Sequence, residues 1–433
     1  MEVWALVMFA VLFVLLLAGF PVAFTLGAVA LAFGSTFLGL DFFDLLPLRI
    51  WGIMTNFTLL AVPLFIFMGV ILEKSGLAEE LLETMGRLFG RVRGGLAISV
   101  VLVGALLAAT TGVVGASVVT MAVIALPVML KHGYAPTLAG GTIAASGTLG
   151  QIIPPSIILI LLGDVIGVPV GQLFMGAAIP GMMLVFSYIL YITFVSWRHP
   201  ELAPAISVIT YDDSELGFKV LKSLLPPLFL VLAVLGSIFL GIASPTESAA
   251  VGALGGLLLA ASHHKLNLVN LNEAMQQTTR LTSMVFLILI GATAFGLVFV
   301  GMGGDHLIFE IFDELPGGKW TFLILSMLLI FLLGFFLDFI EICFIVVPII
   351  APVAIHLGLD PLWFALLIAL NLQTSFLTPP FGFSLFYLKA SAPDLKLQEI
   401  YKGIIPFIII QVVILGLVIT FPGLTLWLPN LMG

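Results

Sequence analysis

The sequence predicts an all-α polytopic membrane protein built from two inverted-topology repeats. Composition and an internal repeat are the two observations behind that prediction. The chain has 433 residues, of which 61% are hydrophobic and 9% are charged, with a mean hydropathy of +1.27. A soluble domain is about 45–50% apolar and about 25% charged. At roughly 20 apolar residues per spanning helix, this length allows about ten to twelve spans.

The composition also excludes several classes of protein. The apolar segments leave no hydrophilic stretch long enough for a soluble catalytic domain. The chain has 15 Lys and Arg residues and a net charge of -8, which excludes nucleic-acid binding. The apolar runs are too long and unbroken for the alternating strands of a β-barrel. The single cysteine, Cys343, cannot form an internal disulfide, and no basic stretch precedes the first apolar run, so no cleaved signal peptide is expected.

The internal repeat divides the chain into two halves. Residues 127–155 align without gaps to residues 352–380, a shift of 225, with eight identical positions. Four of those identities are paired prolines, and proline is too scarce for chance to explain them. We therefore predict a first repeat over 1–205, a cytoplasmic linker over 206–222 and a second repeat over 223–433.

Each repeat is expected to hold the same elements in the same order. Two apolar segments exceed the thickness of one span and carry small or polar residues near the middle, which favours re-entrant helical hairpins over two ordinary helices with a tight turn. An amphipathic segment with Leu at helical spacing predicts a surface arm, and residues 264–280 are assigned as its counterpart. In chain order we expect scaffold helices (1–73), the arm (74–94), hairpin one (95–130) and a broken helix (137–165), then scaffold helices (223–302), hairpin two (319–355) and a second broken helix (362–388).

The distribution of Lys and Arg predicts the orientation of the two halves. The loop over 74–93 carries four basic residues and the loop over 389–402 carries three, so both are placed in the cytoplasm. The loop over 303–318 holds four acidic residues and is placed outside. Hairpin one then enters from the cytoplasm and hairpin two from outside. Inverted repeats with broken helices are typical of secondary transporters, whose binding site lies near the midplane between the repeats.

Two Pro-Pro pairs interrupt equivalent helices, Pro154-Pro155 in the first half and Pro379-Pro380 in the second. Proline removes a backbone donor and clashes with the preceding turn, so two in a row unwind it and free carbonyl oxygens. Such oxygens are tolerated in lipid only where they are buried in protein or line a cavity. Together with the hydroxyls that precede each break, they suit a monovalent cation such as sodium. The alternative is a structural kink sealed by neighbouring Ser and Thr.

The centres of the two hairpins offer further candidate groups. Thr110, Thr111 and Gly112 form a small, flexible tip whose free backbone groups could favour an anion at a helix N-terminus. Asp338 marks the second tip, and an intramembrane carboxylate is a functional candidate by default. It could bind a cation, carry a proton or cap the tip helix, whereas Glu341 is expected nearer the outer surface.

Five short motifs spread over nearly the whole chain resemble one transporter family. They are GFPVAF at 19–24, VPLF at 62–65 followed by Gly69, QIIPPS at 151–156, GIASPTESAAVGA at 241–253 and LTPPFG at 377–382. In this order they resemble the large membrane (permease) subunit, DctM type, of tripartite ATP-independent periplasmic (TRAP) transporters.

The resemblance implies a fold and a function. The fold is that of an elevator-type transporter, similar to the ion-transporter superfamily. The function is sodium-coupled import of an organic acid anion, such as a C4-dicarboxylate or keto acid, across a bacterial or archaeal inner membrane. The implied partners are a small four-helix membrane subunit and a periplasmic substrate-binding protein, with sodium as the coupling ion and no other cofactor. The chain is not expected to be an enzyme.

The resemblance also implies site residues. One sodium site is expected at Thr111, Gly112, Gly147, Thr148 and Gly150, and a second at Asp338, Thr374, Ser375 and Thr378. Substrate-binding or gating roles are expected for Thr110, Ser117, Pro154, Pro155, Ser156, Pro379 and Pro380.

Three other functions remain open at this point. A stand-alone sodium/divalent-anion symporter has a similar architecture but works without a binding protein. A polytopic membrane enzyme is less favoured, because Asp164 lacks an opposed aspartate and no zinc-type His–Glu spacing or phosphate loop occurs. A channel is disfavoured, since duplicated broken helices suit alternating access better than a fixed pore.

Overall fold

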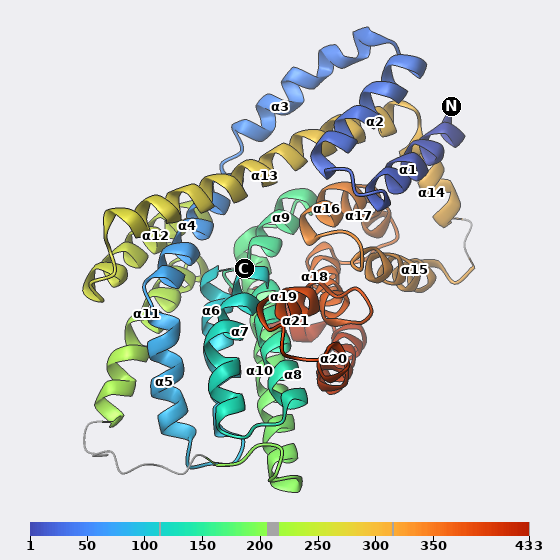
Figure 1. Ribbon diagram of the computed structural model, residues 1–433. Helices are drawn as coiled ribbons and strands as arrows, with labels where there is room; N and C mark the ends of the chain where they lie inside the picture. Colours follow the sequence, from blue (N-terminus) through green and yellow to red (C-terminus); the bar gives the residue numbers. More distant parts are fainter. Residues whose placement is uncertain (112–113, 206–215, 314–315, 433) are drawn as a thin grey trace.

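The computed structural model describes residues 1–111, 114–205, 216–313 and 316–432. Every regular element in these ranges is helical (Figure 1). The first half contains α1 (Glu2–Leu17), α2 (Val22–Phe37), η1 (Leu40–Leu45), α3 (Leu46–Met54), η2 (Thr58–Leu60), α4 (Ala61–Lys74), α5 (Leu77–Phe89), α6 (Gly95–Thr111), α7 (Val114–Lys131), α8 (Pro136–Thr148), η3 (Leu149–Gln151), α9 (Ile157–Ile166) and α10 (Val170–Arg198).

The second half contains α11 (Leu216–Phe239), α12 (Pro245–Ser262), α13 (Leu268–Gly301), α14 (Gly304–Asp313), α15 (Gly318–Leu333), α16 (Phe339–Glu341), the π-helical turn η5 (Ile342–Val346), α17 (Val347–His356), α18 (Pro361–Leu377), α19 (Phe383–Ser391), α20 (Leu397–Thr420) and α21 (Gly423–Met432). Helix α11 begins inside the stretch 206–222 that the sequence assigns to the linker.

Helix boundaries recur at the shift of 225 residues seen in the sequence. When 225 is added to the residue numbers of α7, its first and last residues coincide with those of the run α16–η5–α17. The same shift brings α2 onto α12, with the same last residue. Helix α5 then corresponds to α14, so the assignment of 264–280 as the counterpart of the arm is wrong. That segment opens α13, a single helix of 34 residues. Its first-half equivalent, α3 followed by α4, is instead bent by 57°.

Six described helices are long and apolar enough to cross a membrane, and the bent α3–α4 pair would make a seventh. Six further apolar helices have 10–17 residues and include α9, α15 and α18. Four of the six, α6, α9, α15 and α18, belong to the predicted hairpins and broken helices, where the polar centre of each segment interrupts the helix, while α1 and α2 belong to the predicted scaffold.

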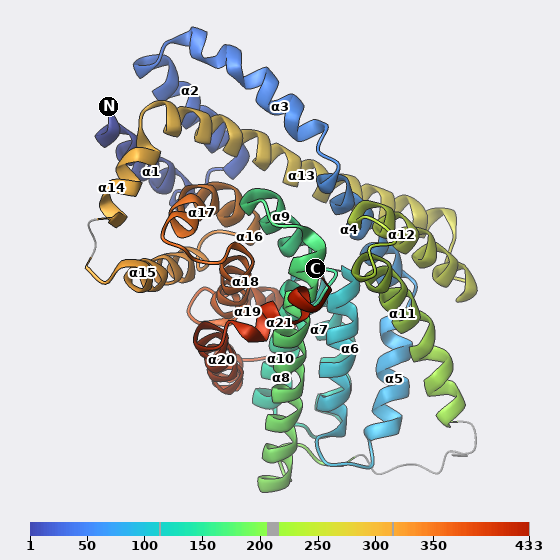
Figure 2. The same ribbon diagram turned by 180° about the vertical axis from the view of Figure 1, so that it is seen from behind.

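The helices form two packed groups, which Figures 1 and 2 show from opposite sides. The scaffold, defined here as α1–α4 and α11–α13, packs α12 on α4 and α13 on both α2 and α4. The core, defined as the hairpins, the broken helices and α20, packs α8 on α6, α7 and α20, and packs α18 on α15 and α20. Hairpin one is α6 with α7; hairpin two is α15 with α16–η5–α17.

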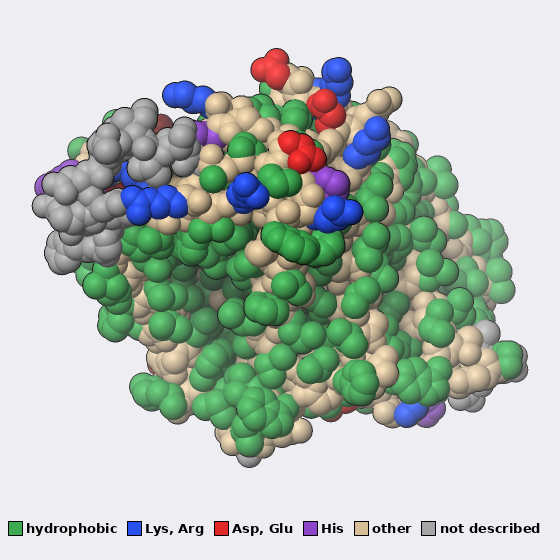
Figure 3. Space-filling view, turned by 90° about the horizontal axis from the view of Figure 1, so that it is seen from below, with side chains coloured by type: hydrophobic (Ala, Val, Ile, Leu, Met, Phe, Trp, Pro, Cys, Tyr) green, Lys and Arg blue, Asp and Glu red, His purple; other side chains and the backbone are tan. Residues whose placement is uncertain are grey.

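The predicted surface arm forms α5, which buries Leu77, Leu81, Leu82 and Met85 and contacts α6 and α11. Its apolar face is therefore occupied by protein, as expected for a helix that braces its neighbours. Figure 3 views the molecule from the end where α5, α6 and α10 meet the connecting loops. Lys and Arg side chains gather along one edge of that face beside a broad hydrophobic surface, in keeping with the predicted cytoplasmic side.

Candidate functional site

The first break, residues 152–156, lies between η3 and α9 and is closed by hydroxyl groups. The Ser156 hydroxyl donates to the Gln151 carbonyl at 2.7 Å, and the Thr148 hydroxyl donates to the Ala145 carbonyl at 2.8 Å. Ser156 also stands at the N-terminal cap position of α9. The predicted residues Gly147, Thr148, Gly150, Pro154, Pro155 and Ser156 are all buried at this break.

The second break, residues 378–382, lies between α18 and α19 and is closed in the same way. The Thr378 hydroxyl donates to the Thr374 carbonyl at 2.7 Å, and the Ser384 hydroxyl donates to the Phe376 carbonyl at 2.9 Å. The kinks are therefore sealed by Ser and Thr, as the structural alternative proposed. A hydroxyl that has given its hydrogen to a carbonyl keeps oxygen lone pairs for another partner, so sealing leaves oxygen ligands at both breaks.

Helix α18 is fastened to the first helix of hairpin two. The Asn371 amide donates to the Met327 carbonyl at 2.6 Å, and the Ser375 hydroxyl donates to the Phe331 carbonyl at 2.9 Å. A Cβ added to Gly334 would lie 2.3 Å from the Ser375 oxygen. Only glycine allows this approach, which places the predicted residue Ser375 against the bend between α15 and α16.

The tip of hairpin two is organised by two carboxylates. The Asp338 carboxylate accepts from the Phe339 amide at 2.8 Å, and the Glu341 carboxylate accepts from the Asp338 amide at 3.1 Å. Asp338 and Glu341 thus form a capping box at the start of α16. Of the three roles open to Asp338, capping is the one that the structure displays. Both side chains remain half-buried.

The tip of hairpin one is only partly described. Gly112 lies outside the described residues, and so do the side chains of Thr110 and Thr111. Ser117 is buried on α7, next to Val118. A Cβ on Gly147 would lie 2.3 Å from the Val118 side chain, so Gly147 packs against α7 at the residue that follows Ser117.

The second segment of each broken helix packs on the hairpin of the opposite half. Helix α9 contacts α16, η5 and α17, while α19 contacts α7. Tyr387 on α19 lies beside Gly115 of hairpin one, whose added Cβ would be 2.8 Å from the ring. Tyr387 therefore packs on hairpin one, and sequence reasoning missed it because nothing in its local sequence marks it.

Two glutamines form a further part of the site that the sequence did not single out. Gln151 and Gln373 adjoin the predicted residues Gly150 and Thr374, and both are at most 1% exposed. Neither amide has a hydrogen-bond partner among the described residues. An unpaired buried polar group costs about 1–3 kcal/mol, so these amides mark a place prepared for a ligand or water. Their positions next to the two breaks are the sequence feature that could have identified them as site residues.

A third glutamine joins the two halves. The Gln411 amide of α20 donates to the Tyr188 hydroxyl at 2.8 Å and lies 3.5 Å from the Thr148 hydroxyl. All three side chains are buried. This network holds the first break against α10 and α20.

Polar contacts also join the scaffold to the core at both ends of α4. The Asn56 amide donates to the Asp164 carboxylate of α9 at 2.5 Å. At the other end, the Thr120 hydroxyl of α7 donates to the Glu73 carboxylate at 3.0 Å. The GIASPTESAAVGA motif adds a link within the scaffold: Thr246 donates to the Phe57 carbonyl at 2.7 Å, beside the bend between α3 and α4.

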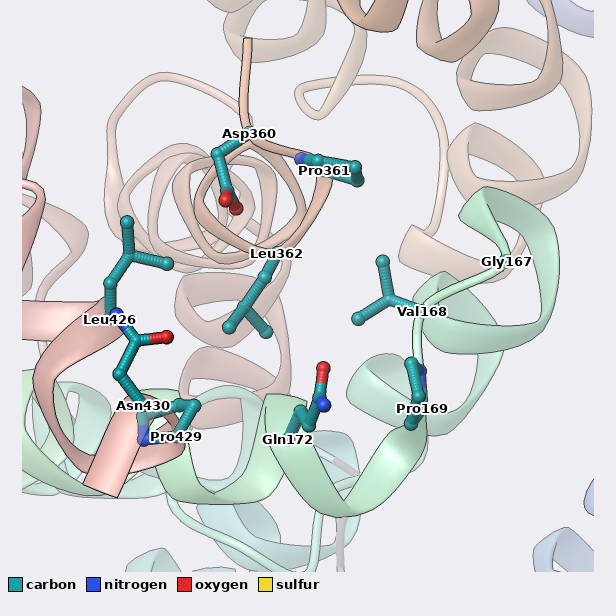
Figure 4. Close-up of a pocket in the computed structure, with 10 residues that line it drawn as sticks. All are labelled: Gly167, Val168, Pro169, Gln172, Asp360, Pro361, Leu362, Leu426, Pro429 and Asn430. Atoms are coloured by element: carbon teal, nitrogen blue, oxygen red, sulfur yellow. The ribbon is translucent and has the colours of Figure 1, made fainter. Parts of the chain in front are cut away.

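Two cavities lie away from the broken-helix residues predicted for sodium or substrate. One, of about 450 Å³, is surrounded by the α9–α10 connection, the start of α18 and the end of α21 (Figure 4). Gln172, Asp360 and Asn430 supply its polar groups. The other, of about 470 Å³, lies between α3, α9, α13, η5 and α17.

This arrangement of helices, breaks and hairpins can be compared with known proteins. The sequence matches the family described as "Tripartite ATP-independent periplasmic transporter, DctM component" over residues 9–424. The chain belongs to this family. It is 31% identical over 422 residues to the sialic acid TRAP transporter large permease protein SiaM of Vibrio cholerae, covering 96% of each chain.

Other relatives extend the range of named substrates. The C4-dicarboxylate TRAP transporter large permease protein DctM of Rhodobacter capsulatus is 29% identical, with 99% of each chain covered. The isethionate TRAP transporter permease protein DctMQ of Oleidesulfovibrio alaskensis is 26% identical, and the match covers 97% of this chain and 66% of DctMQ. Among solved structures, the Alcanivorax borkumensis YdaH transporter has the same fold, with a TM-score of 0.61, 17% identity and 89% of each chain covered.

Family membership confirms the main predictions. This DctM-family chain is a multi-pass inner-membrane TRAP large permease for substrate import, and it is not an enzyme. Permeases of this family work with a small membrane subunit and a substrate-binding protein.

Proposed function

We propose that this chain imports an organic acid anion together with sodium, by an elevator movement of the core against the scaffold. In this proposal a periplasmic substrate-binding protein delivers the anion, and a small four-helix membrane subunit completes the transporter. The relatives named for sialic acid, C4-dicarboxylates and isethionate all handle anions, which supports the substrate class.

The buried polar side chains carry the proposal. The described residues include 20 buried polar side chains, and ten of them lie on the two broken helices, between 136 and 166 and between 361 and 391. None of the 20 is charged. A carboxylate bound there would be a buried anion without a counter-charge, which is strongly unfavourable. A sodium ion bound alongside supplies that charge, and this gives a physical reason for coupling.

The polar groups at the breaks and hairpin tips can bind both sodium and the anion. Sodium is assigned to hydroxyl and carbonyl oxygens at the breaks and hairpin tips: Thr111, Gly112, Gly147, Thr148, Gly150, Asp338, Thr374, Ser375 and Thr378. The hydrogens of Thr148, Ser156, Ser375 and Thr378 are already donated to carbonyls, so these groups offer oxygen rather than hydrogen. Hydrogen-bond donors for the anion then remain on the amides of Gln151 and Gln373.

Reconstitution into liposomes tests the proposal. The chain, its small subunit and its binding protein are expected to take up one of radiolabelled sialic acid, succinate or isethionate when sodium is higher outside. Uptake by the chain alone would instead indicate a stand-alone sodium/anion symporter. Equal uptake with choline in place of sodium would contradict coupling.

Two substitutions test the placement of the sodium sites. Thr111→Leu and Ser375→Leu are each expected to reduce sodium-dependent uptake at least tenfold while membrane insertion is retained, because a bulky apolar group replaces an oxygen ligand. Ser35→Leu, on an exposed position of α2, is the matched control. Normal uptake by both site variants would show that the sodium sites lie elsewhere.

A further inference from the structure

The cavity of about 470 Å³ lies between the scaffold and the core, apart from both breaks. Its scaffold walls come from α3 and α13, and its core walls come from α9, η5 and α17. Figures 1 and 2 both show α13 crossing above α9 and hairpin two. The volume falls within the range of small-molecule sites, about 300–1,000 Å³.

The walls of the cavity are mainly apolar. Apolar side chains of all five elements form most of the surface, including Ile53, Leu289, Phe295, Phe344 and Ile349. A fully polar organic acid would find one cationic side chain on these walls, Arg49, unpaired among the described residues, and would lose its hydration against the rest. The cavity therefore suits a molecule that joins one anionic group to a chain of methylene groups better than it suits a small, fully polar anion.

Three polar side chains interrupt the apolar walls, and two of them already have partners. The Asp164 carboxylate accepts from Asn56, and the Thr293 hydroxyl donates to the Leu289 carbonyl at 2.8 Å. Arg49 of α3 is exposed, and no carboxylate of the described residues pairs with it. A guanidinium presents a fork of donors that matches the oxygens of a phosphate.

We propose that this cavity binds one phospholipid of the surrounding membrane, with its phosphate on Arg49 and an acyl chain along the apolar walls. The cavity combines a cationic side chain, unpaired among the described residues, with mainly apolar walls, and these match the phosphate and the acyl chains of such a molecule. If the core moves against the scaffold as the proposed function requires, the α9, η5 and α17 walls of the cavity shift relative to the α3 and α13 walls, and the lipid lies between them. The binding itself does not depend on that movement.

A substitution at Gly296 can fill the cavity without disturbing the fold. Gly296 lines the cavity on α13, and a Cβ added there meets no heavy atom within 4 Å. A leucine at this position extends into open space, and it also favours the helix. Gly236 on α11 is a matched control, because a Cβ added there is equally unobstructed and it does not line the cavity.

Native mass spectrometry of the purified full chain with added phosphatidylglycerol tests the proposal. We expect the wild-type chain to retain one lipid tightly. Arg49→Gln should weaken retention about tenfold or more, since a hydrogen-bonded charge pair is lost. Gly296→Leu should displace the lipid while the lipid-free protein melts at or above the wild-type temperature. Gly236→Leu and Arg198→Gln, which leave the cavity unchanged, should bind as the wild type does.

Two results would overturn the proposal. Equal lipid retention by the wild type, Arg49→Gln and Gly296→Leu would show that the lipid binds elsewhere. Binding of succinate, isethionate or sialic acid that Gly296→Leu abolishes would assign the cavity to the transported anion. Because the readout is lipid mass rather than uptake, a failure of sodium-coupled transport in liposomes is distinguished from a failure of this proposal.

Discussion

The two Pro-Pro breaks share one backbone design but differ in their surroundings. At the first break, Pro154 and Pro155 are buried, and η3, which leads into the turn, contacts α6, α7, α10 and α18. At the second break, Pro380 is exposed, and its carbonyl accepts from the Tyr401 hydroxyl of α20 at 3.0 Å. One break is thus enclosed within the core, while the other reaches its surface.

The helices that lead into the breaks are also held by different forces. A Cβ on Gly141 of α8 would lie 2.2 Å from the carbonyl oxygen of Gly403 on α20, so backbone meets backbone there. Helix α18 is instead fastened to α15 through the side chains of Asn371 and Ser375. A repeat can therefore preserve the broken helix while the two copies rely on close packing in one half and hydrogen bonds in the other.

The largest expected loss of stability comes from disrupting the close backbone packing of α8 on α20. Gly141→Leu places a side chain where the Gly403 backbone stands, and backbone cannot yield as a flexible side chain can. We expect a loss of about 3 kcal/mol or more, the upper end for overpacking, and a large fall in the melting temperature. Gly236→Leu, which meets no atom within 4 Å, should melt near the wild type. A normal melting temperature for Gly141→Leu would mean that α8 and α20 separate easily.

A smaller effect is expected in the hydrogen-bonded half. Asn371→Leu leaves the buried Met327 carbonyl without its donor, which should cost about 1–3 kcal/mol and lower the melting temperature by a few degrees. Asn270→Leu removes an amide that donates to the Lys265 carbonyl at an exposed site, so its effect should be within about 0.5 kcal/mol. Equal melting of the two variants would contradict the fastening of α18 to α15.

Asp338 allows capping and ion binding to be separated at the second tip. Asp338→Ala removes the cap and should cost about 0.5–2 kcal/mol, whereas Asp338→Asn keeps an acceptor oxygen and should melt near the wild type. Because the proposed sodium site uses the carboxylate charge, Asp338→Asn should raise the sodium concentration for half-maximal uptake severalfold. An unchanged sodium titration would leave Asp338 as a cap alone.

The smallest effect is expected where hairpin one meets the scaffold. Thr120→Val removes the donor to Glu73 with little change of volume and should cost about 0.5–1.5 kcal/mol. If the bond links a moving hairpin to a fixed α4, its loss should alter the maximal uptake rate up to a few-fold and leave KM for the anion unchanged. Thr84→Val, whose hydroxyl donates to the Glu80 carbonyl within its own helix, is the control. A change in KM would place Thr120 at the substrate instead.

Much of the architecture was predictable because its signals are local in the sequence. Hydropathy over about 20 residues identifies a span, and a Pro-Pro pair marks each of the two broken helices, although Pro226-Pro227 lies inside the continuous helix α11. The pairing of 264–280 with the surface arm failed for a related reason. An amphipathic pattern resembles other amphipathic patterns, while only the helix boundaries showed that α13 is the unbroken equivalent of α3 and α4.

Sequence alone therefore determined that this chain is a membrane protein, that it contains an internal repeat and that each repeat carries one broken helix. Tertiary structure decided which groups meet. Tyr387 packs against hairpin one, Gln411 approaches Thr148 across 263 residues of sequence, and two buried glutamine amides have no partner among the described residues. The physical reason is that the sequence of a uniformly apolar helix contains almost no information about which other helix it packs against. Their partners are chosen by the fit of small residues and by the few polar groups that must be satisfied, and both depend on residues far apart in the sequence.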